Sequence, residues 1–332
     1  MKCSNLRSFK SFEAVPLKAA TLGAALLLAV ASAKAQQVDQ VALQLSWLPQ
    51  GQASALFYGK QQACFKDQNI DLTVQRGYGA SDTVNKIVTK AAQFGQIDLA
   101  TLIVARAKNQ APIKAIMPLF TDAPLTIAVR ADNPVRRMKD LEGRSLASGP
   151  GDGGVLMVPL AMKNDGGDGS KIEYRTIEPS ALAGSLLQGR VDSILSYVTT
   201  AAGIDAVAKK SGLSIRTLDF GKDLGIYGDA FFASEDMIKT NPGLVARFQK
   251  AVDCSYRGAQ KDQEGAVKAM VAAAPEMEFE RELMLAKIGW GLIFNSTSPA
   301  LKWDAERLKR TAEATAASQS LQTVPDPATF AQ

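Results

Sequence analysis

The chain has 332 residues, 46% of them hydrophobic, with 38 Lys and Arg, 33 Asp and Glu, and no histidine. Without an imidazole there can be no Ser-His-Asp or Cys-His nucleophile and no histidine-ligated zinc site. A glycosidase needs only two carboxylates, but no acidic pair stands out from ordinary surface acids. The short basic cluster Arg136, Arg137 and Lys139 is too small to predict a nucleic-acid-binding face.

Residues 1–35 have the pattern of a secretory signal peptide. Four basic residues precede an apolar run over 19–30, and Ala33-Lys34-Ala35 forms an A-x-A cleavage pattern. The run is shorter than the ~20 residues needed to span a bilayer, although an uncleaved anchor is the alternative. Because position 36 is Gln rather than Cys, no lipid-anchoring thiol would follow the cut. We therefore expect a mature, unanchored periplasmic chain.

Cleavage would change the charge of the chain. The leader holds five Lys or Arg and one Glu, so the mature 297 residues carry 33 basic and 32 acidic groups, and the formal charge falls from +5 to +1. Cys3 leaves with the leader. Cys64 and Cys254 remain, and in an oxidising compartment they could form a disulfide or stay as two buried thiols. The sequence spacing does not decide between these two states.

Strand and helix patterns alternate along the mature chain. Strands are expected at 41–47, 71–78, 97–103, 113–120 and 125–130, and then at 145–148, 171–177, 191–197 and 214–220. Helices are expected from Pro49 to about Cys64, from Thr83 to Phe94 with Ser81 or Asp82 as its cap, at about 155–163, 180–188 and 200–211, and from 241 to about 318. This alternation predicts an α/β protein of two lobes, each with a mixed, mostly parallel sheet flanked by helices.

Five stretches, at 46–72, 77–102, 138–148, 186–197 and 241–252, carry landmarks of one known family. They include Trp-x-Pro, Phe-Lys-Asp, a Gly/Ser loop before a helix, and Asp-Leu-x-Gly-Arg. In this order they resemble the periplasmic solute-binding proteins of ABC importers, in the subgroup that handles sulfonates, nitrate, taurine and thiamine pyrimidine precursors. Pyrimidine-binding members carry a His just after Trp-x-Pro, where this chain has Gly-Gln-Ala-Ser. That difference argues against a pyrimidine ligand.

The resemblance implies a two-lobed Venus-flytrap fold, the type 2 periplasmic binding protein fold. Lobe 1 would comprise 36–129 and 226–332, and lobe 2 would comprise 130–225. Hinge segments would lie near Arg130–Pro134 and Gly225–Gly228. The partners would be a small-molecule ligand and an inner-membrane ABC permease with its cytoplasmic ATPase, and the protein would be a monomer without metal or cofactor.

Ligands of open α/β sheets bind beyond the carboxyl ends of strands, often at helix N-termini. Trp47 ends the first expected strand and could form a cleft wall, with a core position as the alternative. Arg76 and Tyr78 end the second strand. Arg76 could hold a carboxylate or sulfonate with two hydrogen bonds, or could be an exposed loop residue.

Other candidates lie at helix starts and in lobe 2. Ser81 and Asp82 begin a helix whose amides could face an anion, although both residues could be plain caps, and by resemblance Thr101 follows the third strand. In the stretch GPGDGG (149–154), Gly151, Asp152 and Gly153 form an amide-rich turn that could approach a ligand, with a flexible turn as the alternative. The remaining candidates are Ser196 and Tyr197 at the end of a strand, and Asp229 after the second crossing.

These residues predict a non-enzymatic periplasmic receptor that binds a small organic anion, which could be aromatic, and delivers it to a permease. Trp47 and Tyr197 are expected to face each other from different lobes. One alternative is an enzyme related to the pyrimidine-precursor synthases, which share this fold. Another is a ligand-sensing subunit for a membrane receptor.

Overall fold

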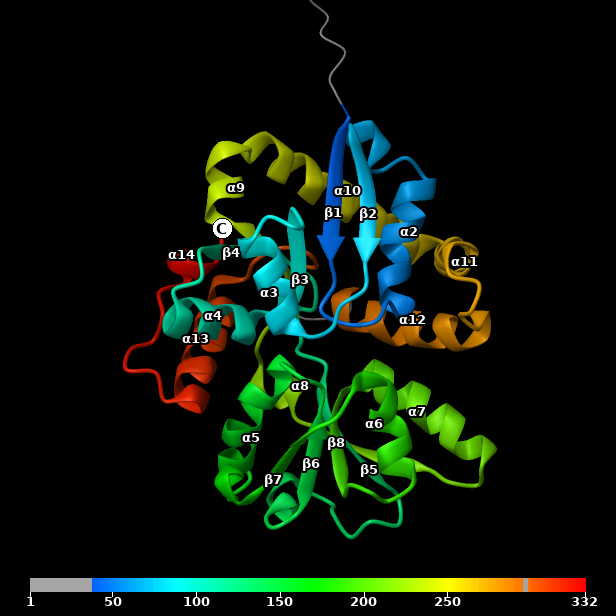
Figure 1. The fold of residues 1–332 in the computed structure, drawn as a ribbon, viewed down its shortest axis with the longest axis vertical. Coiled ribbons are helices and arrows are strands. Elements are labelled where there is room, and N and C mark those ends of the chain that lie inside the picture. The colour runs from blue at the N-terminus through cyan, green and yellow to red at the C-terminus, as the bar shows by residue number, and fades with distance from the viewer. Residues whose placement is uncertain (1–37, 295–297) are drawn as a thin grey trace, which may run out of the picture. The chain divides into compact units, whose positions relative to one another are not determined.

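Two five-stranded sheets with helices on their faces make up the described chain (Figure 1). The computed structural model describes residues 38–294 and 298–332. The predicted signal peptide and its cleavage site lie outside the described residues. Residues Asp39–Gln332 form one unit by their contacts. None of the helices in residues 38–294 and 298–332 is both long enough and apolar enough to cross a membrane.

Lobe 1 is built on the sheet with strand order β2-β1-β3-β10-β4. Its strands are β1 (Asp39–Gln44), β2 (Ile70–Gln75), β3 (Phe94–Asp98), β4 (Ile113–Pro118) and β10 (Asp229–Ser234). β1 pairs parallel with β2 and β3, whereas β10 is antiparallel to β3 and β4. Two apolar clusters fill the space between this sheet and the helices on its two faces.

Lobe 2 is built on the sheet with strand order β7-β6-β8-β5-β9. Its strands are β5 (Leu125–Arg130), β6 (Ser145–Ser148), β7 (Glu173–Thr176), β8 (Ser193–Tyr197) and β9 (Ile215–Asp219). β6 pairs parallel with β7 and β8, and β5 is antiparallel to β8 and β9. Two further apolar clusters pack this lobe. The expectation of two lobes with mixed, mostly parallel sheets is confirmed.

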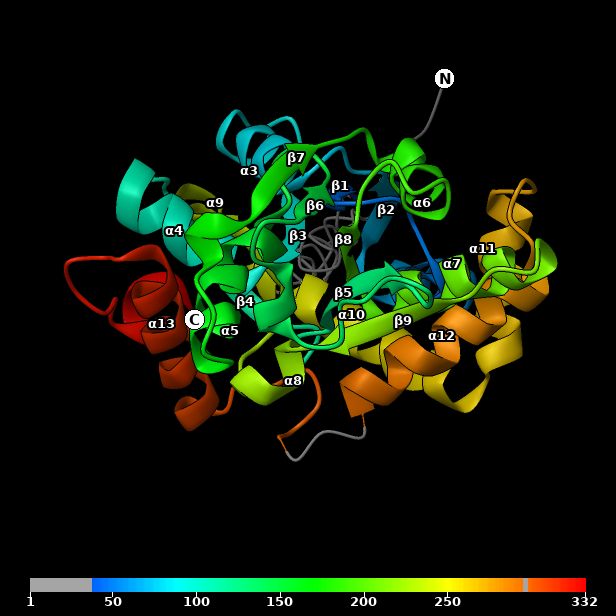
Figure 2. The same cartoon turned by 90° about the horizontal axis from the view of Figure 1, so that it is seen from below.

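Helices connect and cover the strands. The α-helices are α2 (Ser54–Gln61), α3 (Ala80–Val88), α4 (Leu99–Asn109), α5 (Val158–Asn164), α6 (Pro179–Leu187), α7 (Val198–Lys210), α8 (Gly221–Leu224), α9 (Glu235–Thr240), α10 (Pro242–Lys261), α11 (Gln263–Ala273), α12 (Phe279–Phe294), α13 (Ala305–Gln319) and α14 (Pro327–Phe330). Short 3-10 helices are η1 (Gly51–Ala53), η2 (Lys66–Gln68), η3 (Met138–Leu141), η4 (Gly153–Met157) and η5 (Gly169–Lys171). Helix α7 of lobe 2 packs along α12, and α13 packs against α5, as Figures 1 and 2 show. The helical layers of the two lobes therefore touch.

The topology corrects the expected boundary between the lobes. We expected residues 125–130 in lobe 1 and the first crossing near Arg130–Pro134. Instead β5 lies between β8 and β9, so the chain passes to lobe 2 between Pro118 and Leu125. An almost fully buried strand carries no local signal for the sheet in which it pairs. The chain returns to lobe 1 between α8 and β10, over residues 225–228.

Two local expectations also differ from the structure. Helix α3 is capped by Gly79, whose φ is 116°, rather than by Ser81 or Asp82, and it ends at Val88. The run 97–103 divides at Asp98: β3 ends there, and α4 begins with Leu99. The side chain of Asp98 accepts a hydrogen bond from the Thr101 amide and so caps α4. Short apolar runs do not distinguish a strand from a buried helix.

Cys64 and Cys254 form a disulfide in the structure, with their Cα atoms 5.8 Å apart. The bond joins Cys64, in the segment that follows α2, to Cys254 on α10. Helices α2 and α10 also pack against each other. A link across 190 residues ties the amino-terminal part of lobe 1 to its returning carboxy-terminal part.

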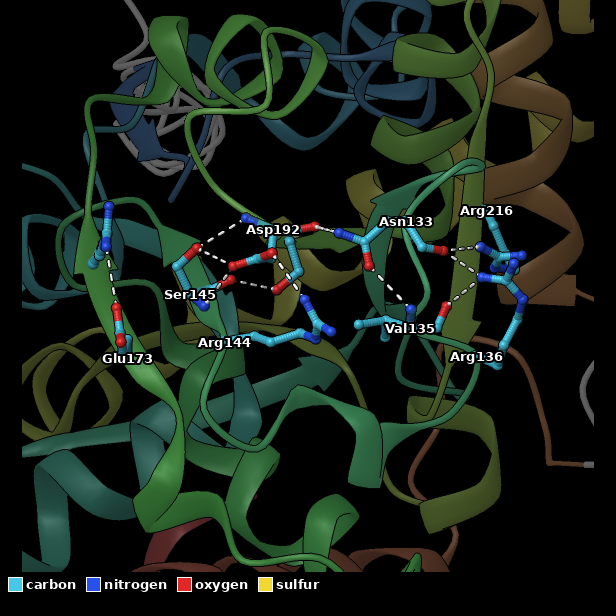
Figure 3. Close-up of polar contacts among 10 residues, drawn as sticks. Asn133, Val135, Arg136, Arg144, Ser145, Glu173, Asp192 and Arg216 are labelled. Carbon is cyan, nitrogen blue, oxygen red and sulfur yellow. Dashed lines mark hydrogen bonds and ion pairs between the residues drawn. The ribbon is translucent and has the colours of Figure 1, made fainter.

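Two of the stretches that carry the family resemblance meet at the edge of lobe 2, at the start of β6 and β8 (Figure 3). Asp192 accepts hydrogen bonds from the Ser145 amide at 3.0 Å and hydroxyl at 2.8 Å, and Arg144 lies 3.3 Å from its other oxygen. Asn133 donates to the Asp192 carbonyl. Although burial opposes it, the Ser145 hydrogen bonds lower the pKa of Asp192. The two family landmarks therefore connect the starts of the neighbouring strands β6 and β8 by hydrogen bonds.

Candidate ligand-binding site

A cavity of about 230 Å³ lies between the lobes, where the carboxyl ends of β1, β3 and β8 and the start of the antiparallel β10 converge. Open α/β sheets bind ligands at this edge. The cavity is lined from both lobes by Leu45, Ser46, Trp47, Leu48, Gln50, Gln52, Ala53, Gly79, Ala80, Gln96, Asp98, Asp152, Gly153, Pro179, Leu182, Ala183, Ile194, Leu195, Ser196, Tyr197, Thr200, Ile204, Asp229, Tyr256 and Arg281.

Three carboxylates line this cavity, each from a different element. Asp98 ends β3, Asp152 lies in the glycine-rich loop after β6, and Asp229 begins β10. Asp98 accepts hydrogen bonds from the Thr101 amide at 2.8 Å and hydroxyl at 2.7 Å. Asp152 accepts one from the Gly154 amide at 3.1 Å. The local backbone therefore holds both carboxylates in place.

Asp229 joins the two lobes through hydrogen bonds. The Tyr197 hydroxyl of lobe 2 donates to one of its oxygens at 2.6 Å, and the Gln96 amide of lobe 1 donates to the other at 2.9 Å. Only 3% of Asp229 is exposed. Both carboxylate oxygens thus have a donor, and the pair Tyr197–Asp229 bridges the cavity from one sheet to the other.

Burial changes the acidity of these groups. It raises the pKa of Asp98 to about 6, although the Thr101 hydrogen bonds lower it. Burial, together with the charges of Asp98 and Asp229, raises the pKa of Asp152 to about 7. Burial also raises the pKa of Asp229, against the donors Tyr197 and Gln96. The cause is the cost of holding several negative charges away from water and near one another.

Two polar groups in the wall have no partner in the described part of the chain. Tyr256 on α10 is fully buried, and its hydroxyl makes no hydrogen bond there. The side-chain oxygen of Gln52 is also buried without a partner. Buried polar groups in native proteins nearly always have a hydrogen-bond partner. Both residues line the cavity, where a bound molecule could supply the missing partner.

The glycine-rich loop of lobe 2 lies directly against lobe 1. A Cβ atom on Gly153 would lie 1.7 Å from the Thr101 hydroxyl oxygen and 2.0 Å from an Asp98 carboxylate oxygen. One on Gly149 would lie 2.9 Å from the Trp47 ring. The Gly151 carbonyl accepts a hydrogen bond from the Ala80 amide at 3.2 Å. Glycine is needed at Gly149 and Gly153 because side chains of lobe 1 come too close to this loop to leave room for a Cβ atom.

The cavity also has an apolar wall. Trp47 follows β1 of lobe 1 but packs against an apolar cluster of lobe 2 that includes Leu182, Ile194 and Ile204. All four residues line the cavity. Trp47 therefore neither lies in the core of its own lobe nor stands free in solvent. Its ring spans the two lobes.

Of the described residues that line the cavity, only Arg281 carries a positive charge. Its guanidinium forms an ion pair with Glu282, the next residue on α12, which is buried. The Glu282 charge therefore offsets that of Arg281. The three aspartates have no cationic partner in this wall.

The structure brings together at the cavity six of the residues predicted from the sequence, namely Trp47, Asp152, Gly153, Ser196, Tyr197 and Asp229. The others lie outside its lining. Arg76 stacks over the ring of Tyr78 at 4.5 Å, and Tyr78 is 55% exposed. Asp82 pairs with Lys86 at 3.1 Å on α3. Ser81 lies next to Gly151. Thr101 is not part of the lining but donates a hydrogen bond to Asp98, which is.

Sequence reasoning missed Asp98, Gln96 and Tyr256. Asp98 had a usable signal, because an Asp at the end of an apolar strand and before a helix combines a strand-end position with an N-cap. Gln96 was missed because the strand was expected at 97–103, which left Gln96 before its start, whereas β3 spans Phe94–Asp98. Tyr256 lies in the middle of α10, and only the packing of that helix brings it to the cavity.

The fold is that of periplasmic binding proteins. The chain is similar to the alkanesulfonate-binding protein SsuA from Xanthomonas axonopodis pv. citri bound to MOPS, with a TM-score of 0.68 and 15% identity over 88% of this chain and 96% of that chain. It is also similar to the desulfurization enzyme DSZB, with a TM-score of 0.58 and 16% identity over 88% and 96%. At such low identity these likenesses show the fold, which binding proteins and an enzyme share.

The sequence defines the family more narrowly. Residues 50–266 match the family model described as NMT1/THI5 like. This match covers more than half of the chain, which therefore belongs to that family. Riboflavin-binding protein RibY of Chloroflexus aurantiacus is 20% identical over 225 residues, 67% of this chain and 62% of RibY. The matched part thus spans less than two thirds of the relative.

Proposed function

We propose that this protein is the periplasmic ligand-binding component of an ABC importer. The observation that carries the proposal is the cavity between two lobes, lined from both and placed where the strand ends of both sheets meet. A ligand there touches both lobes and stabilises the arrangement in which they are in contact. The signal-peptide pattern of residues 1–35 and the binding-protein relatives support export and delivery to a membrane permease.

The chemistry of the cavity favours binding over catalysis. The chain has no histidine. Cys64 and Cys254 are joined in a disulfide, so neither offers a thiolate. In the wall, the hydroxyl of Tyr197 is engaged by Asp229, and that of Thr200 donates to Gln50. Of these two hydroxyls only that of Tyr197 contacts a possible general base, Asp229, and both oxygens of that carboxylate already accept a hydrogen bond. A synthase-like enzyme remains the second candidate because DSZB has this fold.

The cavity suits a small organic molecule with an aromatic or apolar part. Trp47 and Tyr197 supply aromatic surface from opposite lobes, and Gln52, Ser196 and the aspartates supply hydrogen-bonding groups. The organic anion expected from the sequence depended on Arg76. That residue stacks on Tyr78 outside the lining, and carboxylates take its place in the wall. The geometry therefore does not favour an anion.

The experiment that tests the proposal begins with protein purified from periplasm under native conditions. Mass spectrometry identifies the small molecule that copurifies, and intact mass shows whether the chain begins at Gln36. Adding that molecule back should raise the melting temperature, because it binds the folded state alone, and small-angle scattering should show a more compact particle. Chemical conversion of the molecule by the purified protein would contradict the proposal and favour the enzyme.

A further inference from the structure

The charge of the cavity identifies the class of ligand more narrowly than the fold does. Asp98, Asp152 and Asp229 all line one cavity, with Asp152 on lobe 2 and the other two on lobe 1. The positive charge of Arg281 is offset by Glu282. A buried carboxylate is costly unless it is paired or protonated. Among the described residues of the wall, no unpaired positive charge therefore balances the three aspartates.

A single metal ion could not bind all three ionised aspartates and neutralise their charge. Among residues 38–294 and 298–332, no group of three or more acidic or thiol side chains is close enough to hold one. Metal binding by carboxylates needs several oxygens within about 2.6 Å of a single ion. The three aspartates all line the cavity of about 230 Å³ but do not form such a group. A molecule with its positive charge on an organic frame can reach carboxylates that a single ion cannot.

A second observation points to the same occupant. The hydroxyl of Tyr256 is fully buried in the cavity wall and has no partner among the described residues, and the Gln52 oxygen is also unpartnered. Tyr256 can donate or accept a hydrogen bond, whereas the Gln52 oxygen and the carboxylates only accept. The carboxylates and the Gln52 oxygen are complementary to the N–H groups of a ligand, beside the donors that the wall also holds, such as the Arg281 guanidinium.

We propose that the ligand is an organic cation, a protonated amine or amidine with an aromatic or apolar body. Its N–H groups donate to Asp152 of lobe 2 and Asp98 of lobe 1, and its body lies against Trp47 and the apolar wall. Charge-assisted hydrogen bonds of this kind are stronger than neutral ones. The inference rests on the proposed ligand-binding function and adds to it the charge of the ligand. A cation held between Asp98 and Asp152 also draws the lobes together.

The proposal predicts a dependence of binding on pH. A bound cation favours the ionised carboxylates, so binding should release protons wherever the free aspartates are protonated. Asp98 and Asp152 face each other's charge and that of Asp229, and Tyr197, Tyr256 and Arg281 complete the titratable groups of the wall. Since the pKa values of Asp98 and Asp152 are about 6 and about 7, binding should tighten as pH rises through this range.

Three probes of nearly identical shape test the inference, namely benzamidinium, benzamide and benzoate, which differ in charge. Titration calorimetry on the full mature chain at about pH 8 should show benzamidinium bound at least about tenfold more tightly than benzamide, with benzoate the weakest. Lowering the pH to about 5 should weaken benzamidinium binding by at least about tenfold and leave benzamide unchanged. In buffers of different ionisation enthalpy, the heats at intermediate pH should show proton release.

Two variants with the same change of net charge separate the site from general electrostatics. Asp152→Asn keeps an oxygen for the Gly154 amide and removes the charge, so it should abolish the preference for benzamidinium. Asp236→Asn, in an exposed pair with Lys90, should keep the preference. The inference is overturned if benzamide or benzoate binds as tightly as benzamidinium, or if millimolar benzamidinium does not bind. Either result leaves the ligand-binding function standing, whereas conversion of the copurified molecule would refute that function independently.

Discussion

Gly153→Ala should weaken ligand binding without unfolding either lobe. The added methyl carbon would lie 1.7 Å from the Thr101 hydroxyl oxygen and 2.0 Å from Asp98, both in lobe 1. These two side chains are fixed to each other by a 2.7 Å hydrogen bond, and Asp98 also caps α4, so neither can move freely. The methyl group would therefore be accommodated mainly by separation of the lobes.

The size of the effect follows from the cost of overpacking. Inserting a methyl group into a close-packed contact costs typically about 1–3 kcal/mol. If that cost falls only on the state in which the lobes touch, the affinity for the copurified ligand should fall by about 5- to 150-fold. Calorimetry measures the affinity, and scattering with saturating ligand should show a less compact particle than the wild-type protein forms.

Gly184→Ala is the matched control. Gly184 lies on α6 of lobe 2, and its nearest neighbour would be 4.0 Å from the new carbon. This change should leave affinity unaltered and stabilise the helix by up to about 1 kcal/mol. Wild-type affinity in Gly153→Ala would refute the reasoning. A large drop in the melting temperature of the ligand-free variant would also refute it, because the strain would then lie within a lobe.

Three further changes should have separable effects. Trp47→Ala should weaken binding of the copurified ligand by at least about tenfold. It should change the melting temperature little, because the ring is only half-buried and packs on the other lobe. A variant that unfolds readily yet binds normally would show that Trp47 is a packing residue. Asp192→Ala leaves the Ser145 donors unpaired, so denaturant unfolding should show a loss of about 1–3 kcal/mol in the free energy of unfolding. The affinity of the folded protein for the ligand should not change. An unaltered unfolding midpoint would contradict this. Because the pKa of Asp152 is raised from 3.8 to about 7, the folded protein binds this proton more tightly than the unfolded chain does. The resulting contribution to the free energy of unfolding is complete below pH 3.8 and is lost as the pH rises through 7. Asp152→Asn should therefore flatten the fall in melting temperature of the ligand-free protein between about pH 5 and about pH 8, and parallel curves for the two proteins would contradict that assignment.

The sequence by itself determined the architecture of the chain and the general place of its site. Alternating apolar patterns predicted two α/β lobes, because side-chain periodicity is a local property of each strand and helix. The rule that ligands bind at strand ends selected Trp47 and Tyr197, and Asp229 was chosen for its place after the second crossing; all three line the cavity. The GPGDGG stretch was identified as a close-approach turn because glycine lacks a Cβ atom.

Only the tertiary structure decided how these pieces combine. It placed β5 in lobe 2, since strand pairing is set by partners distant in sequence. It brought Tyr256 of α10 to the cavity and removed Arg76 from it. Above all, it set the charge of the site, because Asp98, Asp152 and Asp229 are ordinary acids along the chain. They form one acidic wall only when three segments, separated by 54 and 77 residues, meet at the edges of two sheets.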